Sequence, residues 1–99
     1  MRLSDAEVDL IKSTATKWFG ADCAVRLFGS RVNDAAKGGD IDLHVITSKP
    51  EMATLDAELG FVVDLKGKIG DQRIDLVLRT AHSPEHSIDK IAKTRGVLL

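Results

Sequence analysis

Two aspartates separated by one residue, Asp40 and Asp42, have the spacing that most directly predicts chemistry. Their segment alternates polar and apolar residues as a strand does, which places both carboxylates on one face, about 6.6–7 Å apart along the backbone. Two carboxylates so close repel each other unless a cation lies between them. Hard divalent ions such as Mg²⁺ take oxygen ligands, and a pair of them can stabilise both oxygens of a phosphoryl displacement. The spacing therefore predicts metal-assisted phosphoryl transfer. The alternative is that both aspartates lie on the solvent-exposed face of an edge strand.

The tripeptide Gly29-Ser30-Arg31 lies between a predicted strand and a predicted short helix. Glycine at such a junction lets the backbone approach a ligand closely. The free N–H groups at a helix start favour an anion, typically a phosphate. The Ser30 hydroxyl can donate to a phosphate oxygen, and Arg31 adds a charged contact. The tripeptide therefore predicts nucleotide or phosphate binding, although Ser30 could instead only cap the helix.

Asp75 is a third carboxylate of interest because it lies in the middle of a different predicted strand. If the two strands are neighbours and their polar faces coincide, Asp75 approaches Asp40 and Asp42. It could then complete a metal site and help to remove the proton of an incoming hydroxyl group. The alternative is a solvent-facing residue paired with Arg73 or Arg79.

Helices and strands must alternate to position these residues. The segments predicted in order are a helix at 4–20, a strand at 24–28, a short helix at 30–36, a turn at 37–39, a strand at 40–46, a helix from residue 50 to 69, a strand at 73–79, a helix from residue 83 to 96, and a short edge strand at 97–99. Such alternation predicts an α/β (α+β) fold, with a mixed sheet of three to four strands flanked by helices.

Each long helix carries a start signal. Ser4 and Glu7 form a capping box for the first, Pro50 opens the second, and Ser83-Pro84 caps the third. Gly60 predicts an irregularity inside the second helix. The predicted apolar face of that helix consists of Met52, Leu55, Leu59, Val62, Val63 and Ile69.

Composition narrows the class of protein. The chain has 99 residues, of which 43% are hydrophobic and 29% charged, so we expect one globular domain spanning residues 1–99. A net charge of -1 disfavours general nucleic-acid binding. The single cysteine and the lack of a long apolar run predict a cytoplasmic protein rather than a secreted or membrane-bound one. The small core leaves room for a partner subunit, including a second copy of the chain.

Other reactive side chains are expected to play no part in chemistry. His44 shares a strand face with Asp42, but a hydrogen-bonded or solvated histidine is a better interpretation than a metal ligand. His82 and His86 cannot share a helical face if a helix starts between them, and no Cys/His set has zinc spacing. Cys23 is interpreted as a buried or inert thiol and Trp18 as a core residue.

Three segments together resemble the signature of the minimal nucleotidyltransferases, which belong to the DNA polymerase beta-like superfamily. They are LFGSR at 27–31, GDIDL at 39–43 and RIDLV at 73–77. The end of the chain, a helix followed by GVLL at 96–99, also resembles the usual end of this family. The resemblance covers residues 24–99 and implies a small nucleotidyltransferase fold.

The resemblance also implies roles for the candidate residues. Asp40 and Asp42 would bind two Mg²⁺ ions that hold the triphosphate of ATP, while Gly29 and Ser30 would cradle its β- and γ-phosphates. Asp75 would complete the second metal site and prepare an acceptor hydroxyl. That hydroxyl would attack the α-phosphate and release pyrophosphate, so the expected reaction is transfer of AMP.

Small relatives of this kind are typically encoded beside a HEPN-domain protein. The resemblance therefore implies an antitoxin role, in which AMP is added to a tyrosine of a HEPN toxin. Two alternatives remain open. The chain could neutralise a partner by contact alone, without catalysis, or it could modify a small molecule such as an aminoglycoside, which would require a homodimer to build the acceptor pocket.

Overall fold

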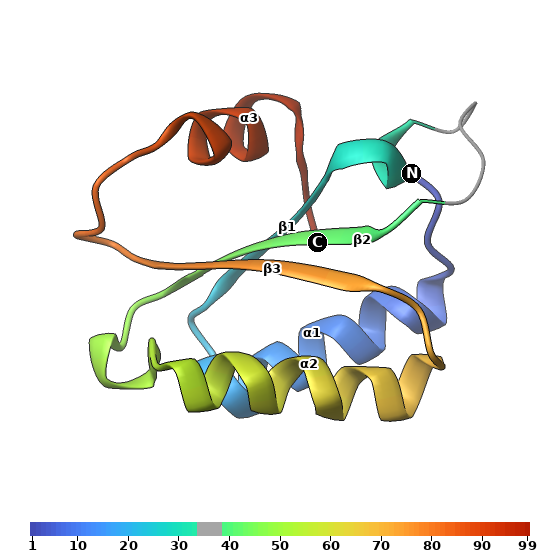
Figure 1. The fold of residues 1–99 in the computed structure, drawn as a ribbon, viewed down its shortest axis with the longest axis horizontal. Coiled ribbons are helices and arrows are strands. Elements are labelled where there is room, and N and C mark those ends of the chain that lie inside the picture. The colour runs from blue at the N-terminus through green and yellow to red at the C-terminus, as the bar shows by residue number, and fades with distance from the viewer. Residues whose placement is uncertain (34–38) are drawn as a thin grey trace.

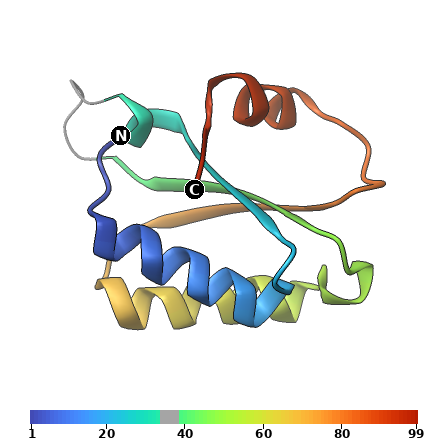
Figure 2. The ribbon, with the colours of Figure 1, turned by 180° about the vertical axis from the view of Figure 1, so that it is seen from behind.

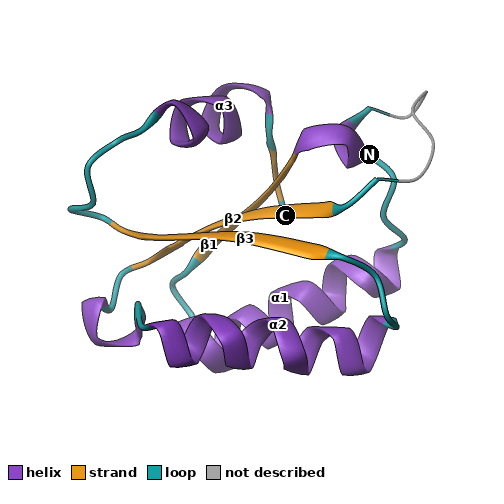
Figure 3. Ribbon diagram, in the orientation of Figure 1, coloured by secondary structure: helices purple, strands orange, loops and turns teal. Residues whose placement is uncertain are grey.

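Helices and strands alternate along the chain in a computed structural model that describes residues 1–33 and 39–99. The elements are, in order, α1 (Asp5–Phe19), β1 (Ala24–Phe28), the 3-10 turn η1 (Gly29–Val32), β2 (Ile41–Thr47), the 3-10 turn η2 (Pro50–Met52), α2 (Leu55–Ile69), β3 (Ile74–Thr80), α3 (Ser87–Arg95) and β4 (Val97–Leu98). The strands form one mixed sheet in the order β3-β2-β1-β4 (Figure 3). The predicted α+β class with a mixed sheet is confirmed.

The sheet has helices on both faces. α1 and α2 lie side by side on one face, whereas α3 and η1 lie on the other (Figures 1 and 2). Alternate residues of a strand point to opposite faces, so every second residue of β1 and β2 enters the core beneath the helices. The core consists of Ile11, Ala15, Phe19, Val25, Leu27, Ile41, Leu43, Val45, Phe61, Leu65 and Ile74.

Strand pairing explains how the two acidic segments meet. β2 runs parallel to β3, and α2 supplies the crossover that a parallel pair requires. β1 pairs antiparallel with β2 on one side and with the short β4 on the other. β2 therefore lies between β1 and β3, and it brings the end of β1 and the start of β3 to one place.

The N-terminal helix begins and ends where its sequence predicts. The Ser4 hydroxyl accepts a hydrogen bond from the Glu7 amide, and the Glu7 carboxylate accepts one from the Ser4 amide. This capping box satisfies two amides that the helix itself leaves unpaired. Gly20 follows as the C-cap, as predicted.

The second helix differs from its prediction in its start and in its buried face. Pro50 opens only the 3-10 turn η2, and α2 begins at Leu55, because the Thr54 hydroxyl caps it by accepting from the Ala57 amide. Phe61 and Leu65 are its buried residues. Three members of the predicted apolar face point into solvent instead, namely Leu55, Leu59 and Val63.

The irregularity predicted at Gly60 is also wrong, because α2 continues through it as a regular helix. The ring of Trp18 lies directly over Gly60, where a Cβ atom would overlap it. The indole Nε1 also donates a hydrogen bond of 2.9 Å to Asp64. Gly60 therefore serves close packing between α1 and α2.

We expect Gly60→Ala to destabilise the fold by about 1–3 kcal/mol, because overlap with Trp18 outweighs the better helix propensity of alanine. Gly67→Ala is the matched control, since Gly67 lies in the same helix with open space around it. There alanine should stabilise by about 0.5–1 kcal/mol. Urea unfolding of both variants measures the two effects, and equal changes in the free energy of unfolding would contradict the packing role of Gly60.

Two further helix predictions need correction. The last helix begins at Ser87 rather than after Ser83, because the Ser83 hydroxyl closes a turn by accepting from the Thr80 amide. The short helix predicted at 30–36 is a single 3-10 turn, Gly29–Val32, as far as the described residues extend. Residues 34–36 of that helix and residues 37–38 of the predicted turn lie outside them.

Within the described ranges, no helix combines the length and apolar character needed to cross a bilayer.

Candidate functional site

Two of the three predicted carboxylates lie on neighbouring strands at the same level of the sheet. The parallel register of β2 and β3 pairs Asp42 directly with Asp75. Because Ile41 and Leu43 enter the core on the face that α1 and α2 cover, Asp42 lies on the opposite face. On its other side, Asp42 pairs with Phe28, the last residue of β1. The register therefore brings two acidic side chains to the point where β1 turns into η1.

The electrostatics of Asp42 are those of a carboxylate in a partly enclosed acidic cluster. Its partial burial raises its pKa, and the nearby charges of Asp75 and Asp40 raise it further. A hydrogen bond with Asp75 acts in the same direction. Each of these effects disfavours the ionised form. A bound cation would favour the ionised form of Asp42 instead. The cluster is therefore better suited to binding a cation than to facing solvent alone.

Asp40 is oriented differently from the other two aspartates. It lies just before β2 and pairs with Arg73, with 3.4 Å between Nε and Oδ2. The side chain of Arg73 is 74% exposed, so this pair is a surface contact. In residues 1–33 and 39–99, no group of three or more His, Cys, Asp or Glu side chains is arranged to hold a metal ion. Asp42 and Asp75 are thus brought together, while Asp40 lies nearby but is turned to Arg73.

Gly29 lies against the Asp42 carboxylate. Its φ of 77° belongs to the left-handed region, which L side chains rarely adopt. A Cβ atom at this position would overlap Asp42 Oδ2. The turn from β1 into η1 therefore needs glycine for its backbone conformation and for the close approach of the carboxylate.

We expect Gly29→Ala to lower the free energy of unfolding by about 1–2 kcal/mol, the cost of a left-handed residue with a side chain, and also to displace Asp42. Gly70→Ala is the matched control, because Gly70 has a similar φ of 91° but open space around it. Both variants should lose stability in urea unfolding. Only Gly29→Ala should change the carboxyl titration of Asp42, followed by NMR, and an unchanged titration would contradict the close approach.

Ser30 is exposed at the start of η1 and lies next to Gly39. Gly39 has a φ of 93°, and a Cβ atom there would overlap Ser30 Oγ. The absence of a side chain at Gly39 thus lets the Ser30 hydroxyl lie close to the backbone that leads into β2. In this position the hydroxyl remains accessible from solvent.

Arg31 is bound within the protein rather than extended toward solvent. Its guanidinium donates to the carbonyl oxygens of Arg2 and Gly39 and to Gln72 Oε1, at 3.0, 3.3 and 2.9 Å. Arg2 reciprocates, because its amide donates to Arg31 O and its guanidinium to Ser30 O. This clamp fixes η1 beside the N-terminal segment. Sequence reasoning missed Arg2, since an arginine near a chain end has no local signature.

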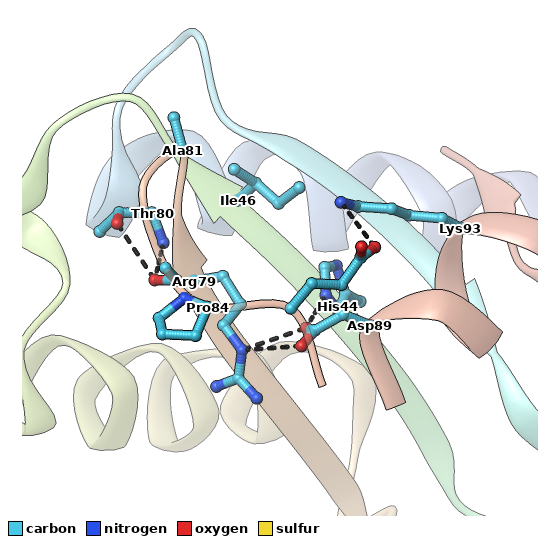
Figure 4. Close-up of a pocket in the computed structure, with 10 residues that line it drawn as sticks. His44, Ile46, Arg79, Thr80, Ala81, Pro84, Asp89 and Lys93 are labelled. Atoms are coloured by element: carbon cyan, nitrogen blue, oxygen red, sulfur yellow. Dashed lines mark hydrogen bonds and ion pairs between the residues drawn. The ribbon is translucent and has the colours of Figure 1, made fainter. Parts of the chain in front are cut away.

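A second polar cluster lies further along the same face, beneath α3. His44 is fully buried in β2, and its Nε2 is 2.7 Å from Asp89 Oδ1, so of the two predicted alternatives hydrogen bonding is correct (Figure 4). Arg79 donates to the same carboxylate from β3 at 3.0 Å. Together with Thr80 and Lys93, among others, these residues line a small pocket of about 70 Å³. Asp89 was missed because an aspartate in a helix gives no sign of a partner 45 residues away.

The pKa of Asp89 is held at about 2. Burial alone would raise it, but the His86 amide, His44 and Arg79 together more than offset that effect. The carboxylate is therefore ionised and joins α3 to β2 and β3. This cluster is structural, and it lies next to the acidic pair because His44 follows Asp42 by two residues on one strand face.

The remaining reactive side chains lie away from the acidic pair in sequence and have other surroundings. Cys23 is half-buried, and its burial raises the pKa of its thiol, which disfavours the nucleophilic thiolate. His86 is the N-cap of α3, and His82 precedes it in the loop.

Comparison with protein families gives one match. The nucleotidyltransferase domain family matches residues 8–98, a segment that contains all six candidate site residues. No curated protein matches the chain at a significant level.

Proposed function

Because the chain belongs to the nucleotidyltransferase domain family, we propose that it transfers AMP from ATP to a hydroxyl group of an acceptor. The observation that carries this proposal is the pairing of Asp42 with Asp75 beside the Gly29 turn. Membership of this family already indicates nucleotidyl transfer as the general reaction. The identities of the nucleotide donor, the metal ion and the acceptor are the further content of the proposal.

The acidic pair fits Mg²⁺, which nucleotidyltransferases typically use. Asp42 and Asp75 repel each other, and the pKa of Asp42 is raised, so a divalent cation would relieve an existing electrostatic cost. Asp40 could join them by exchanging its exposed partner Arg73 for the ion. We propose that these three carboxylates hold two Mg²⁺ ions. When bound, Mg²⁺ would neutralise charge on the triphosphate and on the leaving pyrophosphate.

The residues of the chain have distinct roles in this reaction. The backbone at Gly29 allows a phosphate to approach, and the exposed Ser30 hydroxyl donates to a phosphate oxygen. Asp75 is the exposed member of the acidic pair and accepts the proton of the acceptor hydroxyl. The hydroxyl oxygen forms a bond to the α-phosphorus, the bond from that phosphorus to the bridging oxygen breaks, and pyrophosphate leaves. Arg31 acts through the clamp that holds η1 in place.

The acceptor that we propose is a tyrosine of a HEPN-domain toxin, so that the chain acts as an antitoxin. Support comes from the resemblance of the LFGSR and GDIDL segments and from the exposure of Asp75, which leaves its side of the site open to a macromolecule. A tyrosine hydroxyl also suits a carboxylate base, because its proton is more acidic than that of an aliphatic alcohol.

The test is transfer of label from α-labelled ATP to the co-purified HEPN protein in the presence of Mg²⁺. We expect label on the HEPN protein, its loss when the acceptor tyrosine is replaced by phenylalanine, and its loss in Asp40→Ala and Asp42→Ala. Asp9→Ala is the control, because Asp9 is an exposed carboxylate of α1 outside the cluster. Label on an added aminoglycoside, and none on protein, would replace the proposed acceptor.

A second candidate function is neutralisation by contact alone. The ion pair of Asp40 with Arg73 favours it, because the three carboxylates are not gathered around one point in the described residues. In that case Asp40→Ala and Asp42→Ala would still neutralise the toxin fully, and no label would be transferred.

A further inference from the structure

An apolar stripe lies exposed along α2. Leu55, Leu59 and Val63 are 67%, 56% and 71% exposed, and their spacing of four residues places them in one row. They make up half of the six large hydrophobic side chains that are exposed among the described residues. Gathered on one helix rather than scattered, they form a surface that is costly to leave in water.

Charges along the same helix are arranged by sign. Asp56 and Glu58 lie in its first turn, and Lys66 and Lys68 in its last. Lys68 is used within the chain, where it pairs with Asp64. For Asp56, Glu58 and Lys66, by contrast, the described residues provide no ion-pair partner. The N-terminal half of the surface is thus acidic and the C-terminal half basic, with charges free for a partner.

This pattern is complementary to itself in one orientation. Glu58, Val62 and Lys66 form a row beside the apolar stripe, at four-residue spacing. When two copies of a helix pack antiparallel about a two-fold axis, each row faces its own reversed copy. With Val62 near the axis, Glu58 of one copy faces Lys66 of the other, twice. A parallel pair would place like charges together instead.

We propose that α2 is the interface of a homodimer, in which two copies of the chain pack antiparallel with Leu59 and Val63 at the centre of the contact and Leu55 at its edge. The occupant is a second copy because α2 itself, turned about the two-fold axis, presents the reversed charge order that Glu58 and Lys66 require. α2 lies on the face of the sheet opposite α3 and η1 (Figure 1). Both acidic pairs therefore remain open in the dimer, and the proposal does not depend on the transfer reaction.

The first test is the mass in solution, by sedimentation or light scattering over a dilution series. The wild-type chain should show twice its 10.7 kDa at the higher concentrations. Leu59→Asp should weaken dimerisation at least about tenfold. Circular dichroism should remain unchanged, because Leu59 is already exposed. Asp9→Lys, a charge reversal on the exposed surface of α1, should leave the dimer intact.

The second test reverses the proposed charge pair. Glu58→Lys and Lys66→Glu should each weaken the dimer, because each places like charges opposite one another. An equimolar mixture of the two variants, or the double variant, should restore it. A wild-type chain with the single-chain mass throughout the series would overturn the proposal. So would a dimer that neither Leu59→Asp nor the two reversals weaken.

Discussion

Asp42→Asn is expected to lower nucleotidyl transfer at least about 10²–10³-fold and, at the same time, to raise the melting temperature of the metal-free protein. The two effects have one cause, since Asp42 lies where burial, Asp75 and Asp40 all disfavour its charge. Two unit charges about 4 Å apart in a water-like medium interact by about 1 kcal/mol. For a domain of this size, that corresponds to a rise of about 4–8 °C. Calorimetry in the presence of a chelator measures it.

The stability of the metal-free protein should depend on pH in a direction that follows from the raised pKa of Asp42. The pKa of Asp42 is raised in the folded state, so the folded chain binds its proton more tightly than the unfolded chain does. The destabilisation is therefore present at neutral pH and disappears as the pH falls through the raised pKa. The advantage of Asp42→Asn should shrink accordingly on acidification. Added Mg²⁺ should stabilise the wild type and not the variant.

Asp9→Asn is the matched control for these measurements, because Asp9 is exposed on α1 away from the acidic pair. It should change neither transfer nor the response to Mg²⁺. A clear fall in the melting temperature of metal-free Asp42→Asn would mean that the carboxylate holds the fold together. If Asp42→Asn retains nucleotidyl transfer, Asp42 is not part of the active site.

Local signals in the sequence were sufficient for much of the fold. The capping box of Ser4 and Glu7 acts within four residues, and it placed the start of α1 correctly. The alternation of apolar residues placed β2 and β3 within a residue of their bounds. The pairing of Asp42 with Asp75 was a conditional prediction, which required β2 and β3 to be neighbours with coincident faces. The parallel register satisfies that condition.

The misplaced elements depend on tertiary contacts. Periodicity predicted an apolar face of α2 that includes Leu59 and omits Phe61. Phe61 is buried instead because it packs against α1, whose Phe19 ring lies 5.2 Å from that of Phe61. Ser83-Pro84 has a good local cap sequence, yet its serine satisfies the backbone of β3 instead. The clamp between Arg2 and Arg31 likewise joins segments that no local pattern relates.

The largest change in stability is expected from Asp89→Ala. This buried carboxylate accepts from His44, Arg79 and the His86 amide, so its removal leaves a buried histidine and a partly buried arginine without their anion. Breaking a buried pair by removing one partner costs about 3–5 kcal/mol, a large part of the roughly 5–15 kcal/mol that stabilises a domain. We expect a correspondingly lower midpoint of urea unfolding, with α3 released from the sheet.

The acid limb of the stability curve isolates the role of the charge. The pKa of Asp89 is held at about 2, below the ordinary value, so its contribution is present above about pH 4 and is lost as the pH falls toward 2. Asp89→Asn keeps the size of the side chain and should lose that part of the acid dependence. Glu85→Ala removes the exposed pair with Lys93 and should change stability by no more than about 1 kcal/mol. If Asp89→Ala unfolds at the same urea concentration as Glu85→Ala, the buried carboxylate does not hold α3 against the sheet.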